Sequence, residues 1–557
     1  MPYVPENPVI VQSDHSILLE TMGPHFEAAR NGLVGFAELV KSPDYVHSYR
    51  LTPLSLWNAA ATGLRVQEVL ATLEKFAKYD IPPNVPVWVE ETMARYGRLQ
   101  LRPGSPQLVL EAHSALLMKE VSSLKVIIPL LGEPISDTEI EIDPAFRGEL
   151  KQALIQAGHP VEDLAGYVDG ETLEIALRHT TLSNKDFALR EYQVHAVDAF
   201  HGDGMVRGGS GVIVLPCGAG KTMVGIAAMH RLGMNTLILC TNVTALRQWK
   251  AEILDKSTLT EEEVGEYSGQ EKNIKPVTLA TYQVLTYRKS KNDDFVHFGL
   301  FNERNWGLII YDEVHLLPAP VFRAVAHIQA RRRLGLTATL VREDGRQGDV
   351  FALIGPKRFD VPWKDLEHQG WIASAQCTEI RIPLSEDDRL RYAIADEREK
   401  FRIASTNTRK GPIIEELLSK HEGERVLILG MYLDQLDWIS KRWKLPIITG
   451  RTPQRERDRL FNNFRSGEAP AMVISRVGNF SVDLPDASVA IQVSGTWGSR
   501  QEEAQRLGRI LRPKQNTTNK AWFYSVVSRD TNEQEYAERR QLFLTEQGYA
   551  YHINPRD

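Results

Sequence analysis

The stretch Val214-Leu215-Pro216-Cys217-Gly218-Ala219-Gly220-Lys221-Thr222 decides the fold of this 557-residue chain. The apolar run 211–215 predicts a buried strand, the glycines after it predict a turn, and 223–230 predicts a helix. This order places bare backbone N–H groups and a helix N-terminus around one point, where the helix dipole favours negative charge. The stretch therefore predicts a phosphate-binding loop, although Leu215 replaces the first Gly of the pattern G-x-x-x-x-G-K-S/T.

The side chains of this loop fit a nucleotide with a bound metal ion. Lys221 can reach the β- and γ-phosphates, and Thr222 can offer its hydroxyl to Mg²⁺. Gly218 and Gly220 let the backbone approach the phosphates closely. A Gly-rich turn in front of a lysine can also occur without a ligand, so a second motif is needed to decide between the two interpretations.

An acidic motif supplies that support. The apolar run 308–311 predicts a second buried strand, which leads directly into Asp312-Glu313-Val314-His315. In ATPases with such a loop, an acidic residue after a strand holds Mg²⁺. We expect Asp312 to take that role and Glu313 to orient or deprotonate the attacking water. An isolated Asp-Glu pair can be a solvated turn, but the two motifs together favour ATP hydrolysis.

Composition limits the class of protein. The chain is 42% hydrophobic and 25% charged with a net charge of −6, so several globular domains are expected, and a nucleic acid would be held by local basic patches. The three cysteines, Cys217, Cys240 and Cys377, form no CxxC pair, which argues against a disulfide framework, a zinc site and an iron–sulfur cluster. Because no apolar run reaches membrane-spanning length and no signal pattern is present, we expect a cytoplasmic protein with no membrane partner.

Short apolar strands alternate with helical stretches from about residue 185, which predicts a parallel α/β sheet with ligands at the carboxyl ends of its strands. The predicted strands are 211–215, 236–240, 277–280, 308–311 and 333–336. The pattern returns at 426–429, 446–448, 472–474 and 489–493 without a second phosphate loop. We predict an α/β fold with two tandem RecA-like parallel-sheet domains, 185–375 and 376–557, and a nucleotide in the cleft between them.

The N-terminal part of the sequence has a different pattern of apolar residues. Helical apolar spacing over 55–62 and 66–79 predicts a mostly helical domain at 1–100. Residues 101–180 are predicted to form a small α+β module. Its elements are strands at 108–112 and 125–130 and helices at 145–157 and 171–178.

The second sheet domain carries a basic helix at 505–512. Arg506, Arg509 and Arg512 recur every three residues, so one helical face carries all three side chains. Such a face is often merely solvated, but phosphoryl transfer develops charge that an arginine can neutralise. We expect Arg509 and Arg512 to reach the γ-phosphate.

Together these motifs resemble motifs I, II, III and VI of superfamily 2 helicases, at 215–222, 312–315, 336–339 and 505–512, in the same order. The finer resemblance is to the bacterial form of the XPB (xeroderma pigmentosum group B) helicases. It is carried by the Asp-Glu-Val-His box and by four further segments. These are Arg342-Glu343-Asp344 after motif III, 187–193 as an adenine-reading Q motif, the C-terminal segment 540–549, and 55–59 in the N-terminal region.

The resemblance implies further site residues. Gln193, with Arg190 beside it, would bind adenine, and Asp483 would lie near the ribose. Contact with the nucleic acid, or its coupling to ATP, is implied for Asn242, Gln248, Trp249, Thr281, Thr337, Thr339, Arg342, Glu343, Asp344, Gln505 and Arg506. The segment 384–407 would contain a thumb-like insertion, and 101–180 stands in the place of a damage-recognition domain.

The function that the resemblance implies is an ATP-dependent DNA helicase or translocase of 3′-to-5′ polarity that acts in DNA repair. ATP and Mg²⁺ are the implied cofactors, single-stranded and forked DNA the implied substrates, and a nuclease or repair protein a candidate partner. Two alternatives stay open. One is an RNA helicase on the same fold, and the other is an ATP-gated scaffold that binds or remodels duplex DNA without unwinding it.

Overall fold

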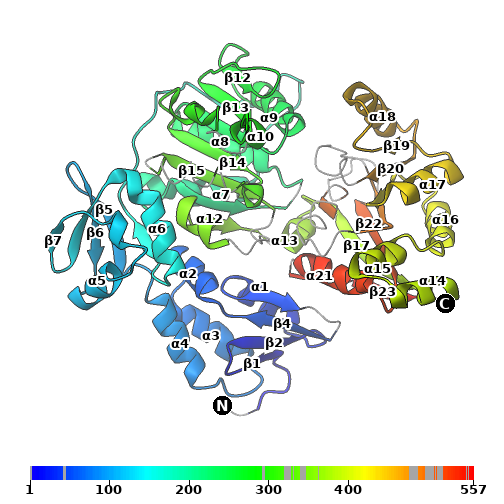
Figure 1. Ribbon diagram of the computed structural model, residues 1–557, viewed down its shortest axis with the longest axis horizontal. Helices are drawn as coiled ribbons and strands as arrows, with labels where there is room; N and C mark the ends of the chain where they lie inside the picture. Colours follow the sequence, from blue (N-terminus) through cyan, green and yellow to red (C-terminus); the bar gives the residue numbers. More distant parts are fainter. Residues whose placement is uncertain are drawn as a thin grey trace. The chain divides into compact units, whose positions relative to one another are not determined.

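The computed structural model describes the chain except for residues 1–2, 42–44, 217, 291–294, 319–320, 322–327, 330, 339–346, 362, 476–486, 496–506, 509, 511–518, 547–548, 550 and 557. The chain divides into two compact units (Figure 1). Unit 1 comprises Met1–Glu38, Tyr49–Leu215 and Gly220–Val361, and unit 2 comprises Leu39–Ser48, Pro216–Ala219 and Pro362–Asp557.

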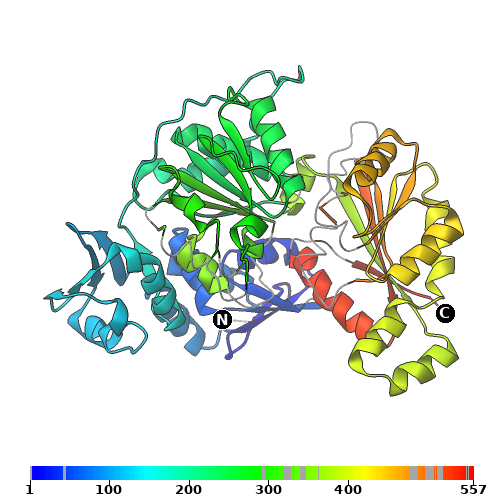
Figure 2. The same ribbon diagram turned by 45° about the horizontal axis from the view of Figure 1, so that its top comes forward.

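Unit 1 contains the first sheet domain, a seven-stranded parallel sheet with the order β12-β13-β11-β14-β15-β10-β16. Its strands are β10 (Ser210–Val214), β11 (Thr236–Cys240), β12 (Val264–Tyr267), β13 (Val277–Thr281), β14 (Leu308–Asp312), β15 (Arg332–Thr337) and β16 (Lys357–Asp360). Helices cover both faces (Figure 2), which explains why the central strands are apolar without alternation. They are α7 (Glu191–His201), α8 (Lys221–Leu232), α9 (Val243–Lys256), α10 (Tyr282–Leu285) and α12 (Gln347–Leu353), with the 3₁₀ turns η3 (Gly202–Gly204), η4 (Phe298–Asn302) and η5 (Val314–Leu316).

The strand order places the predicted motifs at one edge of this sheet. In the register of the parallel pairs, Val214 lies beside Thr337 and Asp312 lies beside Leu336. The carboxyl ends of β10, β15 and β14 are therefore neighbours, with β15 in the middle. All five strands predicted for this domain are confirmed.

The N-terminal module corrects one prediction. Residues 1–100 are not mostly helical, because a four-stranded sheet with the order β1-β2-β4-β3 occupies much of the first fifty residues. Its strands are β1 (Val9–Val11), β2 (Ser16–Glu20), β3 (Glu38–Lys41) and β4 (Val46–Arg50), which are too short to stand out as periodic runs. The helices are α1 (Phe26–Val34), α2 (Pro53–Ala61), α3 (Val66–Phe76) and α4 (Asn84–Met93), of which α2 and α3 confirm the predicted helical segments.

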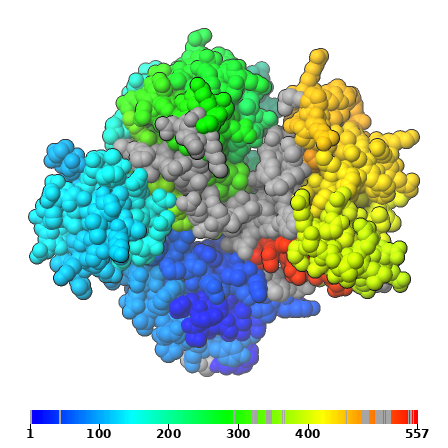
Figure 3. Space-filling view, viewed as in Figure 1, coloured from blue at the N-terminus to red at the C-terminus, as the bar shows by residue number. Residues whose placement is uncertain are grey.

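The α+β module follows in unit 1 as a five-stranded sheet with the order β7-β8-β6-β5-β9. Its elements are β5 (Leu99–Pro103), β6 (Leu108–Ala112), β7 (Pro134–Ser136), β8 (Glu139–Ile142), β9 (Val161–Asp163), α5 (Ala115–Ser122), α6 (Arg147–Gln156), η1 (Ile128–Leu130) and η2 (Pro144–Phe146). The predicted strand at 108–112 and helix at 145–157 are confirmed. Helix α6 packs on α12 and α2 packs on β16, so both N-terminal modules contact the first sheet domain, and they adjoin each other on the face shown in Figure 3.

Two predicted elements of this region are wrong. Residues 125–130 form no strand, because they end in the 3₁₀ turn η1, where Pro129 has no backbone N–H for a ladder. Residues 171–178 form no helix. Leu173 and Ile175 are both buried with a spacing of two, and isolated bridges pair Thr172 with Met234 and Leu177 with Ser257, so this segment is extended.

Unit 2 contains the second sheet domain, a seven-stranded parallel sheet with the order β19-β20-β18-β21-β22-β17-β23. Its strands are β17 (Ser374–Ile382), β18 (Val426–Gly430), β19 (Ile447–Ile448), β20 (Ala471–Ser475), β21 (Val489–Gln492), β22 (Lys520–Ser528) and β23 (Tyr551–Pro555). The helices are α13 (Trp363–His368), α14 (Glu386–Ile394), α15 (Glu397–Ser405), α16 (Lys410–Lys420), α17 (Leu433–Trp443), α18 (Gln454–Ser466) and α21 (Asn532–Glu546). The predicted fold class, two parallel-sheet domains in tandem, is confirmed. The segment 384–407 forms α14 and α15.

Two further observations concern the predictions made from composition, on the cysteines and on membrane-spanning segments. Cys240 and Cys377 are buried free thiols, and Cys217 lies outside the described residues. Among the helices that the structure describes, none combines the length and the apolar composition needed to cross a lipid bilayer.

Candidate active site

The phosphate-binding loop has the backbone that its glycines predict. Strand β10 ends at Val214, and α8 begins at Lys221 with Gly220 as its N-cap. The φ angles of Gly218 and Gly220 are 84° and 80°, in the left-handed region that glycine adopts at little cost. A Cβ atom on Gly220 would lie 2.6 Å from Nε2 of Gln193, so a side chain there would displace that amide as well as strain the backbone.

An ion pair joins the two predicted motifs. The Lys221 Nζ atom lies 3.1 Å from Oε1 of Glu313, and the two side chains are only 12% and 18% exposed. Burial by itself would raise the pKa of Glu313, but the charges of Lys221 and His315 and a hydrogen bond from the Ala338 backbone hold that pKa below its ordinary value. Glu313 is therefore a carboxylate at neutral pH, as a residue that orients or deprotonates water must be.

Asp312 is held from two sides. The indole Nε1–H of Trp249 donates to Oδ2 of Asp312 at 3.1 Å, and the hydroxyl of Tyr282 donates to the Asp312 carbonyl oxygen at 2.9 Å. Burial and the neighbouring charge of Glu313 raise the pKa of Asp312, whereas Lys221 and the Trp249 N–H oppose that rise. The Trp249 bond thus fixes one oxygen of the carboxylate and favours its ionised form.

Trp249 and Thr281 lie inside the fold. Trp249 is 2% exposed, and its ring packs so closely on α8 that a Cβ atom on Gly225 would lie 2.4 Å from it. Thr281 is also 2% exposed, and its hydroxyl accepts the Val284 N–H as the N-cap of α10. Side chains buried this deeply do not face the surface, so of the two roles that the resemblance implied, coupling to the acidic motif suits them better than direct contact with DNA, and it stays a prediction.

Asn242 and Gln248 lie on the outer part of the same edge. Asn242 caps α9, with its Oδ1 accepting the Ala245 N–H at 2.9 Å, and it is partly exposed. Gln248 is partly exposed on the second turn of α9. Because α9 follows the carboxyl end of β11, both residues lie beyond the same edge as the acidic motif, and their predicted contact with DNA stays a prediction.

His315 connects the acidic motif to the middle strand. Its Nδ1 atom lies 2.6 Å from the hydroxyl oxygen of Thr337 and 3.5 Å from Oε2 of Glu313. Thr337 ends β15, and its carbonyl oxygen accepts the N–H of Leu215 at 2.9 Å. A continuous set of contacts therefore runs from Lys221 through Glu313 and His315 to Thr337. The motif contained His315, but no role was predicted for its side chain, because only the fold brings β15 beside it.

The residues expected to bind adenine lie against the loop. Gln193 is 3% exposed, its Oε1 accepts the Arg190 backbone N–H at 3.0 Å, and its amide nitrogen abuts Gly220. The Arg190 guanidinium donates to the Tyr192 hydroxyl at 3.0 Å. The structure thus brings Gln193 and the loop together, as the resemblance implied.

Several predicted site residues lie outside the described residues. They are Thr339, Arg342, Glu343, Asp344, Asp483, Gln505, Arg506, Arg509 and Arg512. Their roles stay predictions.

Comparison with known proteins decides the family. The protein called DNA 3'-5' helicase XPB in Kineococcus radiotolerans is 54% identical over 99% of this chain and 97% of that protein. Its namesake in Mycobacterium tuberculosis is 52% identical over 99% of this chain and 98% of that protein. The chain belongs to the XPB family of helicases. A more distant XPB relative is the general transcription and DNA repair factor IIH helicase/translocase subunit of Enterocytozoon bieneusi, which is 34% identical over 98% of this chain and 92% of that protein.

Family models agree with this membership. The ERCC3/RAD25/XPB C-terminal helicase matches residues 366–556, which include the second sheet domain. The type III restriction enzyme res subunit matches 186–342, and a helicase conserved C-terminal domain matches 9–136. The XPB resemblance read from the motifs is confirmed, and the protein is a helicase, an enzyme class that uses ATP.

Proposed function

We propose that this protein is an ATP-dependent DNA helicase or translocase that moves with 3′-to-5′ polarity. The observation that carries the proposal is the meeting of Lys221, Glu313 and Asp312 at one edge of the first sheet domain, in a chain that matches its bacterial XPB relatives over 97–98% of their length. The names of those relatives favour DNA over RNA and supply the polarity.

The donor set fits a magnesium ion. A carboxylate at Asp312 and a hydroxyl at Thr222 are the hard oxygen ligands that Mg²⁺ takes, alongside waters and phosphate oxygens. An ion held by Asp312 and Thr222 would supply positive charge against the charge that develops on the phosphates. Trp249 orients the Asp312 carboxylate for this role by binding one of its oxygens.

The remaining roles follow from the contacts. Lys221 leaves its pair with Glu313 to bind phosphate, which frees the Glu313 carboxylate to orient or deprotonate the attacking water. Gln193 and Arg190 bind adenine beside the loop. Arg509 and Arg512 complete the site from the second sheet domain, a role supported by their helical spacing and by the family.

The DNA interface is proposed from position and family. Asn242 and Gln248 would contact the backbone of one strand, and Arg342, Glu343 and Asp344 would act in strand separation. Phosphate contacts of this kind predict binding that weakens steeply with salt and depends little on sequence. We further propose single-stranded and forked DNA as substrates, DNA repair as the process, a nuclease or repair protein as a partner, and the cytoplasm as the location.

A strand-displacement assay tests the proposal. Partial duplexes carry a single-stranded tail on the 3′ or the 5′ side, in matched DNA and RNA versions, and ATP turnover is measured in the same reactions. We expect displacement with Mg²⁺ and ATP only on DNA that offers a 3′ tail, and none with Lys221→Ala. Turnover without displacement on every substrate would instead support an ATP-gated DNA clamp, and displacement of RNA alone would refute the DNA assignment.

A further inference from the structure

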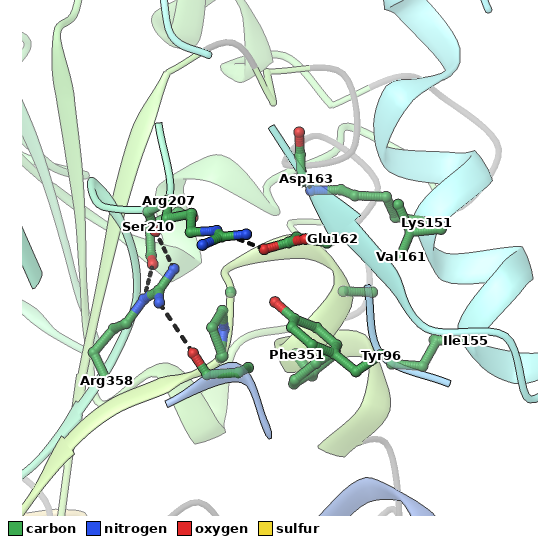
Figure 4. A pocket seen from close by; sticks show the side chains of 14 residues that line it. Tyr96, Lys151, Ile155, Val161, Glu162, Asp163, Arg207, Ser210, Phe351 and Arg358 are labelled. Atoms are coloured by element: carbon green, nitrogen blue, oxygen red, sulfur yellow. Dashed lines mark hydrogen bonds and ion pairs between the residues drawn. The ribbon is translucent and has the colours of Figure 1, made fainter. Parts of the chain in front are cut away.

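A cavity of about 60 Å³ lies in unit 1 where the α+β module meets the first sheet domain (Figure 4). Glu162 of β9 and Lys151 of α6 line it from the module, and Arg207, Arg358 and Phe351 line it from the sheet domain. It borders Ser210, the first residue of β10, whereas the phosphate-binding loop follows the other end of that strand. The two ends are about 13 Å apart, so the cavity is separate from the nucleotide site.

Both carboxylates of the cavity wall are already engaged. Asp163 accepts two hydrogen bonds from Arg147, at 2.8 and 3.1 Å, and one from Lys151 at 2.7 Å. Glu162 accepts the Nε–H of Arg207 at 2.7 Å through one oxygen, and its other oxygen accepts an amide N–H at 3.0 Å. The negative charge of both carboxylates is therefore balanced by these donors and does not face the open space of the cavity.

Two guanidinium groups nearby have no carboxylate partner. Within the part of the chain that the structure describes, Arg358 donates only to the carbonyl oxygens of Ser210, Ala61 and Arg207, and Arg333 likewise donates only to carbonyl oxygens. Arg333 is 1% exposed. The cluster thus sets four guanidinium groups and the Lys151 amine against two carboxylates. The guanidinium groups are those of Arg147, Arg207, Arg333 and Arg358, and the carboxylates are those of Glu162 and Asp163.

Burial and the neighbouring charges act together on Lys151. Burial lowers the pKa of Lys151 to about 7, with Asp163 opposing the shift and Arg333 and Arg147 adding to it. An ammonium group keeps its proton more readily beside a negative charge. A bound anion would therefore stabilise this cluster.

Unused donors point into the cavity. Among the described residues, the Tyr96 hydroxyl forms no hydrogen bond, and Figure 4 shows it directed into the space between Arg207, Glu162 and Phe351. The ring of Phe351 meets the Tyr96 ring edge-on, with 6.2 Å between centroids, and so holds its direction. Arg207 uses only its Nε–H on Glu162, which leaves both terminal nitrogens available at the more exposed side of the cavity.

We propose that this cavity binds a phosphate-sized tetrahedral oxyanion, with the Tyr96 hydroxyl and the guanidinium groups of Arg207 and Arg358 as donors. A water molecule needs roughly 10–15 Å³ of such space, so the volume suits one small oxyanion, and the rest of any larger ligand would have to stay outside the cavity. Because its walls come from two modules, the bound anion would also strengthen the attachment of the α+β module to the sheet domain. Free phosphate and a phosphodiester of DNA share this chemistry as possible sources.

The test is a titration of the full-length protein with inorganic phosphate at constant ionic strength, followed by phosphorus NMR. The Lys221→Ala background weakens phosphate binding at the nucleotide loop. It leaves intact the cavity between the α+β module and the first sheet domain, called the junction cavity below. In that background we expect Tyr96→Phe, which keeps the ring and removes one hydrogen bond to a charged group, to weaken binding roughly ten-fold. Arg207→Gln should act in the same direction, and Arg65→Gln, at the exposed N-cap position before α3 of the N-terminal module, is the matched control.

The titration distinguishes the two possible sources of the anion from a failure of the proposal. If a short DNA strand without terminal phosphates competes with phosphate, and Tyr96→Phe weakens that competition, the phosphodiester is the source; if it does not compete, free phosphate is. Equal phosphate affinity in Lys221→Ala with and without Tyr96→Phe and Arg207→Gln would overturn the proposal. The result is independent of strand displacement, so its failure would leave the proposed helicase activity untouched.

Discussion

The Trp249→Phe substitution tests the role of the indole bond to Asp312. Phenylalanine keeps an aromatic ring against Gly225 but removes the Nε1–H that donates to Oδ2 at 3.1 Å. A hydrogen bond to a charged group contributes about 1.5–3 kcal/mol, and one pKa unit corresponds to roughly 1.4 kcal/mol. Dividing the first energy by the second gives the expected rise in the pKa of Asp312, which is about one to two units.

The sign of the effect follows from the ionised state. Burial already raises the pKa of Asp312, and only its carboxylate form holds Mg²⁺, so activity is lost as pH falls through that pKa. In Trp249→Phe the acid limb of the ATPase profile should move to higher pH, and kcat/KM for Mg·ATP at neutral pH should fall roughly ten-fold.

The assay is DNA-stimulated ATP turnover against pH and Mg²⁺ concentration. Trp438→Phe, at a tryptophan that is 48% exposed on α17, serves as the matched control, and the melting temperature of each variant checks the fold. An unchanged acid limb and Mg²⁺ dependence in a folded Trp249→Phe protein would refute the reasoning, because the carboxylate would then need no support from the indole.

Three further predictions concern the nucleotide site. Lys221→Ala should abolish ATP turnover and leave DNA binding largely intact in a filter-binding assay. Normal turnover in this variant would refute the assignment of the nucleotide site. Gly220→Ala should abolish ATP binding measured by calorimetry, because the added Cβ would meet Gln193 at 2.6 Å on a backbone with φ of 80°. Arg509→Ala should reduce the rate of hydrolysis more than the affinity for ATP, since an arginine that acts on the transition state contributes little to ground-state binding; equal losses of both would speak against that role.

In the first sheet domain the five inner strands could be predicted, and the two edge strands, β12 and β16, could not. Strands β10, β11 and β13 are buried over their whole length, so their sequences are continuous apolar runs. Strand β16 at the edge reads Lys-Arg-Phe-Asp and is only partly buried throughout, which leaves no apolar signal. The three residues of β1 are likewise too few to show a period.

Some residues of the candidate site could likewise be predicted from the sequence, and others could not. Lys221 and Asp312 could be assigned because each follows an apolar strand, and parallel strands end at a common edge. The Trp249–Asp312 bond could not, since it joins a helix to a strand across 63 residues of sequence, and a tryptophan on an amphipathic helix gives no sign of its partner. For the same reason the pairing of His315 with Thr337 across 22 residues became visible only in the fold.

Strand β15 reaches both regions of unit 1 that have been proposed to bind phosphate groups. Its last residue, Thr337, contacts His315 of the acidic motif, and its second residue, Arg333, donates to the carbonyl oxygen of Leu353 on α12, beside the junction cavity. The two ends of this strand are about 17 Å apart, and the strand is hydrogen-bonded to a parallel neighbour on each side. One hydrogen-bonded strand therefore connects the side of the sheet that adjoins the α+β module with the side that carries the acidic motif.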